Sequence, residues 1–113
     1  EFRKVHQFNV FSSVMPLQAA FADCMADASQ YLQLPGFYQK KRDFFQKMLE
    51  KTPFKPLACH GTYFQLCDYS AVSDLPEREF CEWLTVEHGV AGIPVSAFYS
   101  DGRNQKLLRF CFA

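Results

Sequence analysis

The sequence has no net charge, no long apolar run and no glycine-rich turn before a helix, and each absence removes a class of function. Its 12 basic and 12 acidic side chains cancel, so no basic surface indicates binding to nucleic acid or to an anionic membrane. The longest apolar runs are too short to span a bilayer. Without a glycine-rich turn, the common phosphate-binding loops are excluded.

Paired cysteines are absent as well. The five cysteines are odd in number, and none belongs to a close Cys-x-x-Cys pair. The odd number argues against a disulfide framework, and the missing close pair argues against a zinc site. The three histidines also lack the spacing of metal ligands. We therefore expect no bound metal, and reduced thiols of the kind found in a cytoplasmic protein.

What the sequence does have is the length of one small domain and many phenylalanines. Its 113 residues are 49% hydrophobic and include 13 phenylalanines, which excludes disorder and low complexity. This aromatic content indicates a dense core or a face that packs on something else. The first residue is not methionine, and the sequence stops after an apolar, strand-like run. We therefore expect a segment of a longer polypeptide.

Apolar periodicity and turn residues predict helices packed on a short sheet, an α/β (α+β) domain. After an irregular segment over residues 1–12, Ser12 or Ser13 caps the first helix, and Ser73 or Asp74 caps the third. The third helix buries Phe80, Trp83 and Leu84 and ends at Gly89. The expected helices cover residues 14–28, 37–51 and 76–88, and the expected strands cover 54–59, 62–68, 90–93 and 106–112.

Arg109 is a single cation inside a run that is otherwise apolar, residues 107–112. A guanidinium stays charged at any working pH, and its planar fork of donors matches a carboxylate. If this strand is buried, the charge needs an anionic partner, and a substrate carboxylate would be one. If the strand is half-buried, Arg109 faces water. The residue pattern alone leaves both interpretations open.

Three blocks of the chain resemble the fold-type I, pyridoxal-phosphate-dependent aminotransferases. Residues 89–113 contain Gly-Val-Ala-Gly-Ile-Pro-Val-Ser-Ala-Phe-Tyr and then Leu-Leu-Arg-Phe-Cys-Phe-Ala. They are similar to the C-terminal region of the methionine and kynurenine (glutamine transaminase K-like) aminotransferases. Residues 3–11, Arg-Lys-Val-His-Gln-Phe-Asn-Val-Phe, resemble the segment after the cofactor-binding core. Residues 60–70, His-Gly-Thr-Tyr-Phe-Gln-Leu-Cys-Asp-Tyr-Ser, resemble a strand of the small domain.

The resemblance implies that residues 1–35 are a linker and helix leading from a cofactor-binding domain. Residues 36–113 would then form the small C-terminal domain, without its final helix. The parent would be a homodimer that moves an amino group between an amino acid (methionine, aromatic or kynurenine-like) and a 2-oxo acid. No lysine here has the serine and glycine neighbours of the family's cofactor-binding lysine. We therefore expect no catalytic residue, no bound pyridoxal phosphate and no activity in this segment alone.

The resemblance also implies substrate-binding residues. Arg109 takes the position that binds the α-carboxylate of the substrate, so we favour this role over the solvated one. Phe11 would reach across the dimer into the partner's active site, or it packs under the first helix. Tyr63 and Phe64 alternate on a strand, so one of them faces the substrate cleft, or both belong to the core. Residues 93–95 would border the substrate entrance.

Two other functions remain open. A non-catalytic interaction module would use the phenylalanine-rich surface to dock a protein. A lyase on the same fold is the second, because a fold does not determine a reaction.

Overall fold

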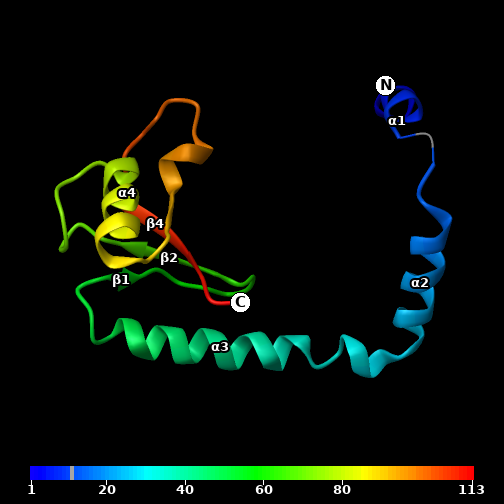
Figure 1. Ribbon diagram of the computed structural model, residues 1–113, viewed down its shortest axis with the longest axis horizontal. Helices are drawn as coiled ribbons and strands as arrows, with labels where there is room; N and C mark the ends of the chain where they lie inside the picture. The colour runs from blue at the N-terminus through cyan, green and yellow to red at the C-terminus, as the bar shows by residue number, and fades with distance from the viewer. Residues whose placement is uncertain (11) are drawn as a thin grey trace. The chain divides into compact units, whose positions relative to one another are not determined.

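The computed structural model describes residues 1–10 and 12–113, and the chain divides into two compact units (Figure 1). The first unit is Glu1–Pro35, and the second is Gly36–Ala113. Within the described ranges, no helix has both the length and the apolar character needed to cross a membrane.

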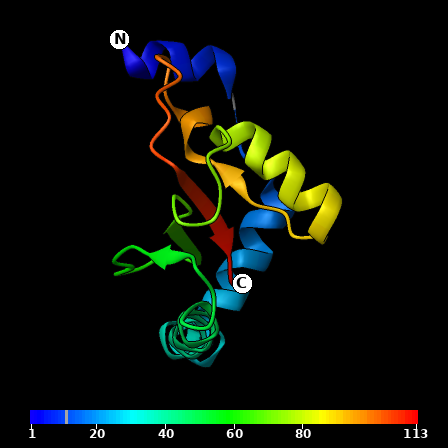
Figure 2. The same cartoon turned by 90° about the vertical axis from the view of Figure 1, so that its left-hand side faces the viewer.

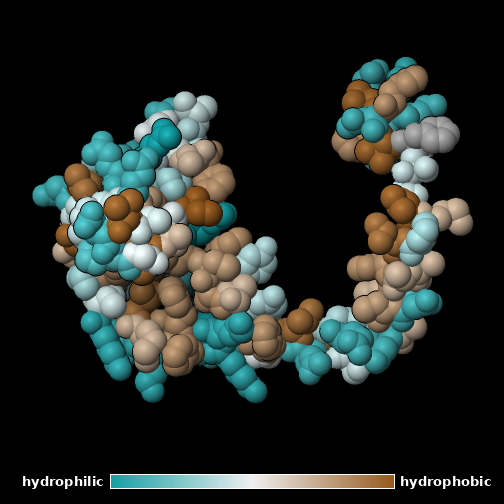
Figure 3. Space-filling model, viewed as in Figure 1, coloured by the Kyte–Doolittle hydropathy of each residue, from teal (hydrophilic) through white to brown (hydrophobic). Residues whose placement is uncertain are grey.

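Before α3 begins, the described residues of the first unit form α1 (Phe2–Asn9), α2 (Met15–Ala26) and the 3₁₀ turn η1 (Ala28–Gln30). Neither helix contains a buried residue, and Figure 3 shows apolar side chains on the surface of α2.

Two expectations for this unit are wrong. The segment over residues 1–12 is not irregular, because α1 forms there: it has no internal glycine or proline, and Phe2, Val5 and Phe8 recur at a spacing that helices allow. The N-cap of α2 is Val14, without a side-chain hydrogen bond, rather than Ser12 or Ser13.

A four-stranded antiparallel sheet forms the centre of the second unit. Its strands are β1 (Lys55–Pro56), β2 (Phe64–Asp68), β3 (Ile93–Pro94) and β4 (Leu107–Cys111), in the order β1-β2-β4-β3. The strand that comes last in the sequence therefore lies inside the sheet, as Figure 2 shows for the red β4.

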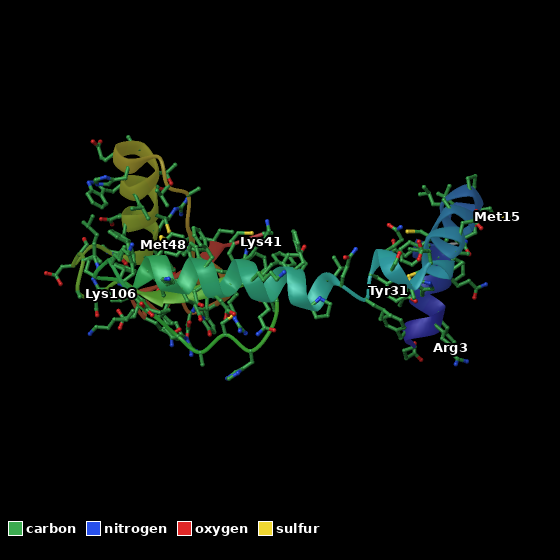
Figure 4. All side chains as sticks on the ribbon, turned by 90° about the horizontal axis from the view of Figure 1, so that it is seen from below. Arg3, Met15, Tyr31, Lys41, Met48 and Lys106 are labelled. Atoms are coloured by element: carbon green, nitrogen blue, oxygen red, sulfur yellow. The ribbon has the colours of Figure 1, made fainter. Side chains whose placement is uncertain are left out.

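Two helices and one 3₁₀ turn accompany this sheet: α3 (Leu34–Leu49), α4 (Glu77–His88) and η2 (Val95–Phe98). Lys41 and Met48 lie along α3 in Figure 4. The core forms on one face of the sheet, where the rings of Tyr69 and Phe80 stack with their centroids 4.2 Å apart. Its buried members are Leu49, Cys67, Tyr69, Phe80, Cys81, Leu84, Leu108 and Phe110. The predicted combination of helices with a short sheet is confirmed.

Helix α4 follows its prediction closely, except at its first turn and on one side. Gly89 adopts the left-handed conformation of a C-cap, with φ of 66°, which costs glycine little. The N-cap is Pro76 and makes no side-chain hydrogen bond, so the expected caps at Ser73 and Asp74 are wrong. Trp83 is 39% exposed, whereas the helix buries Glu77 and Cys81, which the apolar stripe did not include.

The strands are shorter than predicted. The first, expected over residues 54–59, is reduced to Lys55–Pro56, although the N–H of Leu57 still donates to the carbonyl oxygen of Leu66 in β2 at 2.9 Å. The strand expected over 90–93 is reduced to Ile93–Pro94, and η2 occupies part of the expected loop at 94–105.

Candidate functional site

The face of the sheet opposite the core carries Arg109 at its centre. Alternation along β2 and β4 buries Gln65 and Leu108 on the core face and leaves Arg109 on the other. Arg109 is paired in register with Leu66 of β2 on one side and with Ile93 of β3 on the other. The sheet therefore presents a single guanidinium between two aliphatic neighbours.

Two aromatic rings lie against this guanidinium. Its central carbon is 4.1 Å from the ring centroid of Phe64 and 5.0 Å from that of Phe98. Nε of Arg109 is buried and has no hydrogen-bond partner in the described part of the chain. The ion pairs found there involve other arginines. The rings pack on a planar cation whose N–H groups can still donate to a carboxylate.

The structure brings only some of the expected site residues together. Phe64 contacts Arg109, whereas Tyr63 is 44% exposed and packs on Tyr38 and Phe64, with centroids 6.0 and 4.4 Å away. Phe11 lies outside the described residues.

Phe98 is a site residue that the sequence did not single out. It was expected in a loop, but it ends η2 and is 62% exposed while its ring faces Arg109. The sequence offered one clue to Phe98: it lies between the apolar Ile93–Val95 segment and the polar residues 100–105.

Glu77 is a buried carboxylate that is hydrogen-bonded both to η2 and to the beginning of β4. Its carboxylate accepts backbone N–H groups from Ser96 at 2.5 Å, Gln105 at 2.8 Å and Leu107 at 3.1 Å. Burial alone would raise its pKa, but these hydrogen bonds outweigh burial and hold the pKa below its ordinary range. Glu77 is therefore a buried carboxylate that keeps its charge.

Lys106 binds the loop before α4 in a separate set of contacts. Its Nζ donates to the carbonyl oxygens of Asp74 and Leu75, the latter at 3.0 Å. The same group lies 5.6 Å from the ring centroid of Tyr69. This lysine is thus fully engaged by the protein itself.

The cysteines offer no reactive site in the core. All five are free, and burial raises the pKa of Cys67 to about 12 and that of Cys81 to about 11. Both remain thiols at neutral pH. Across residues 1–10 and 12–113, no group of three or more histidine, cysteine, aspartate or glutamate side chains gathers to bind a metal.

Comparison with known proteins identifies the family of this chain. Residues 1–113 match the family of class I and II aminotransferases. The chain belongs to this family, whose structural neighbours here have the fold-type I architecture.

Among its relatives is the methionine aminotransferase of Escherichia coli (strain K12), 53% identical over 100% of this chain and 30% of that protein. The kynurenine–oxoglutarate transaminase 1 of Mus musculus is 33% identical over 97% of this chain and 31% of its own. The crystal structure of YbdL from Escherichia coli, identified with a methionine aminotransferase function, matches with a TM-score of 0.89. That match has 51% identity and covers 97% of this chain and 29% of YbdL. The chain therefore spans about three tenths of these relatives' length.

The family implies pyridoxal phosphate, and the described residues do not fit it. Lys106 is held by backbone carbonyls, and Nζ of Lys41 lies over the exposed ring of Phe37, 4.8 Å from its centroid. The other lysines are exposed. Covalent binding of the cofactor needs a lysine whose amino group is directed at the cofactor, together with hydrogen-bond donors for the cofactor's phosphate.

Proposed function

We propose that this chain is the substrate-binding C-terminal part of a pyridoxal-phosphate-dependent aminotransferase. The parent enzyme would move an amino group between an amino acid of the methionine, aromatic or kynurenine type and a 2-oxo acid. Support comes from the family match over residues 1–113 and from the two relatives. The same match weighs against a non-catalytic interaction module, and the names of both relatives weigh against a lyase.

One observation carries the site assignment: the guanidinium of Arg109 lies between two rings with its buried Nε unpaired. A carboxylate is the ligand that such a planar fork binds best. We assign Arg109 to the substrate α-carboxylate, with Phe64 at its side. Fixing the carboxylate orients the Cα–H bond of the substrate, which is catalysis by positioning.

The cofactor, when bound in the parent, supplies an electron sink for the bonds at the substrate Cα. We propose that residues 1–35 lead from the cofactor-binding domain and that residues 36–113 form the small C-terminal domain without its final helix. This chain alone is expected to hold no cofactor and to be inactive. The five free cysteines support a cytoplasmic location.

The test replaces Arg109 in the full-length enzyme. Arg109→Lys keeps the charge but loses the paired planar contact. Hydrogen bonds to charged groups contribute about 1.5–3 kcal/mol, so kcat/KM for amino acids should fall roughly ten- to a hundred-fold. Arg109→Ala should lower it further. Steady-state kinetics and the absorbance of the bound cofactor measure both effects.

Amines without an α-carboxylate serve as the control, because they never contact the guanidinium. Their turnover should change little in either variant. If Arg109→Ala left amino-acid turnover intact and only lowered the melting temperature, Arg109 would be a structural residue and the assignment would be wrong.

We also propose that the parent is a homodimer, with residues 1–12 near the interface and Phe11 reaching the partner's active site. Phe2, Val5 and Phe8 of α1 are 83%, 67% and 87% exposed in this chain, and apolar side chains of this kind suit an interface. Sedimentation of the full-length enzyme should give a dimer. A fully active monomer at micromolar concentration would contradict the proposal.

A further inference from the structure

Glu77 is a buried charged group that the proposed function does not yet use. It is 1% exposed and stands at the first position of α4. Its two carboxylate oxygens bind different segments of the chain. Oε2 accepts a hydrogen bond from the N–H of Ser96, and Oε1 accepts hydrogen bonds from the N–H groups of Gln105 and Leu107. One carboxylate thus joins η2 to the beginning of β4.

Both of these segments carry a residue of the candidate site. Ser96 lies in η2 two residues before Phe98, and Leu107 lies on β4 two residues before Arg109. Phe98 is 62% exposed, so burial in the core does not hold its ring in place. Within η2, buried Val95 anchors one end, and the hydrogen bond from Ser96 to Glu77 ties the same turn to the beginning of β4.

We propose that Glu77 is a positioning residue for carboxylate recognition: it holds η2 against β4, so that Phe98 stacks on Arg109 and fixes the plane of its donors. This inference rests on the proposed function, in which Arg109 binds the substrate carboxylate. Glu77 touches neither the substrate nor the cofactor and acts through Phe98 and Arg109.

Glu77→Gln separates the two links. The amide keeps one oxygen, which can serve Gln105 and Leu107, but it then directs an NH₂ group at the N–H of Ser96. Two donors face each other, so η2 is released. In the full-length holoenzyme the KM for L-methionine should rise about ten-fold, since a guanidinium held less firmly binds the carboxylate less tightly. The kcat should fall as well, because the Cα–H bond of the substrate is then less well oriented.

Lys106→Met is the matched control. It removes hydrogen bonds from the residue next to Leu107, yet those bonds hold the loop before α4 and do not involve η2. It should lower the melting temperature without raising the KM for L-methionine. Equal rises in KM for Glu77→Gln and Lys106→Met would overturn the proposal, because Glu77 would then act only through stability.

Phe98→Ala keeps the proposal testable if Glu77→Gln folds poorly, because an exposed ring can be removed without opening the core. It should raise the KM for L-methionine by a similar factor, and adding Glu77→Gln to it should change little more. An unchanged KM in Phe98→Ala would overturn the proposal. Arg109→Ala is measured in the same series to separate the two proposals. If Arg109→Ala also leaves the KM unchanged, the proposed function is wrong. If Arg109→Ala raises the KM while Phe98→Ala does not, only the proposed role of Glu77 is wrong.

Discussion

Two charged side chains in the second unit meet their surroundings in opposite ways: Glu77 is buried, whereas Arg109 is half-buried with its Nε atom enclosed. Glu77 accepts three backbone N–H groups, whereas Arg109 faces aromatic rings with Nε unpaired. Cation–π contacts contribute about 0.5–2 kcal/mol each, but they leave the N–H donors unused, and a buried unpaired donor costs about 1–3 kcal/mol. A bound carboxylate would remove that cost, so Arg109 is better suited to binding than to stabilising the fold.

Glu77 should make the stability of the second unit depend on acid pH. Its pKa is lowered in the folded state, so the unfolded state takes up the proton first as the pH falls. Its contribution is fully present above the ordinary glutamate pKa of about 4.3 and is lost as the pH falls through the lower folded-state pKa. Urea unfolding from pH 7 to pH 3 should therefore show a steeper loss for the wild type than for Glu77→Gln.

Other carboxylates set the baseline for that comparison. Local hydrogen bonds to Ser70 and Arg103 lower the pKa of Asp68 and Asp101, respectively, on the surface, and both are unchanged in the variant. Parallel curves for the two proteins would show that Glu77 titrates alike in the folded and unfolded states.

Sequence reasoning singled out Arg109 and its neighbour Phe64, but not Phe98 or Glu77. A lone cation in an apolar run is visible in the sequence, because the contrast is local. Phe98 and Glu77 were not predicted, since their roles depend on contacts between distant residues: Glu77 binds partners 19, 28 and 30 positions away. A glutamate in the first turn of a helix is ordinarily read as a solvated group.

Among the elements, α4 contributes Phe80, Cys81 and Leu84 to the buried core. Phe80 is fully buried against Tyr69, whose hydroxyl donates to the carbonyl of Leu75 at 2.8 Å. On the outer side of Phe80, Trp83 stacks with its ring centroid 5.5 Å away but stays 39% exposed. Two large aromatic side chains on one helix thus differ sharply in burial.

Phe80→Ala should destabilise the second unit by about 3–5 kcal/mol, because it leaves a cavity in a packed core. Trp83→Ala is the matched control and should cost about 1 kcal/mol, the value of an exposed aromatic contact. Urea unfolding followed by far-ultraviolet circular dichroism measures both. Similar losses of stability in the two variants would show that the burial of the ring does not determine the cost of removing it.

Element prediction succeeded where local signals agreed. For α4, the apolar spacing and the C-cap glycine indicate the same helix, and the structure has it at Glu77–His88. Helix α1 was missed although Phe2, Val5 and Phe8 recur at a helical spacing, because its eight residues give only about two turns of pattern. The ends of β1 and β3 were misplaced because ladder pairing with distant strands, rather than local composition, decides where a strand stops.

At the scale of the whole molecule, burial is unevenly divided. The described residues of Glu1–Pro35 include none that is buried, whereas Gly36–Ala113 holds the complete core cluster. Stability of a small domain comes mainly from buried apolar surface, so it should reside in the second unit.

A chain that begins at Leu34 should therefore unfold cooperatively in urea, with a midpoint close to that of residues 1–113. A peptide of residues 1–33 should show little helix, since isolated helices shorter than about 12–15 residues are marginal in water. Circular dichroism of the two pieces checks this. Loss of the cooperative transition in the shortened chain would mean that the first unit stabilises the second.

The position of β4 has a consequence for synthesis on the ribosome. Its neighbours β2 and β3 both precede it in the sequence, yet they are joined only through it. A nascent chain can pair β1 with β2, but it must wait for residues 107–111 before the sheet closes and Leu108 and Phe110 enter the core. Arg109 lies in that same strand, so the segment that joins β2 to β3 also brings the proposed carboxylate site into the sheet.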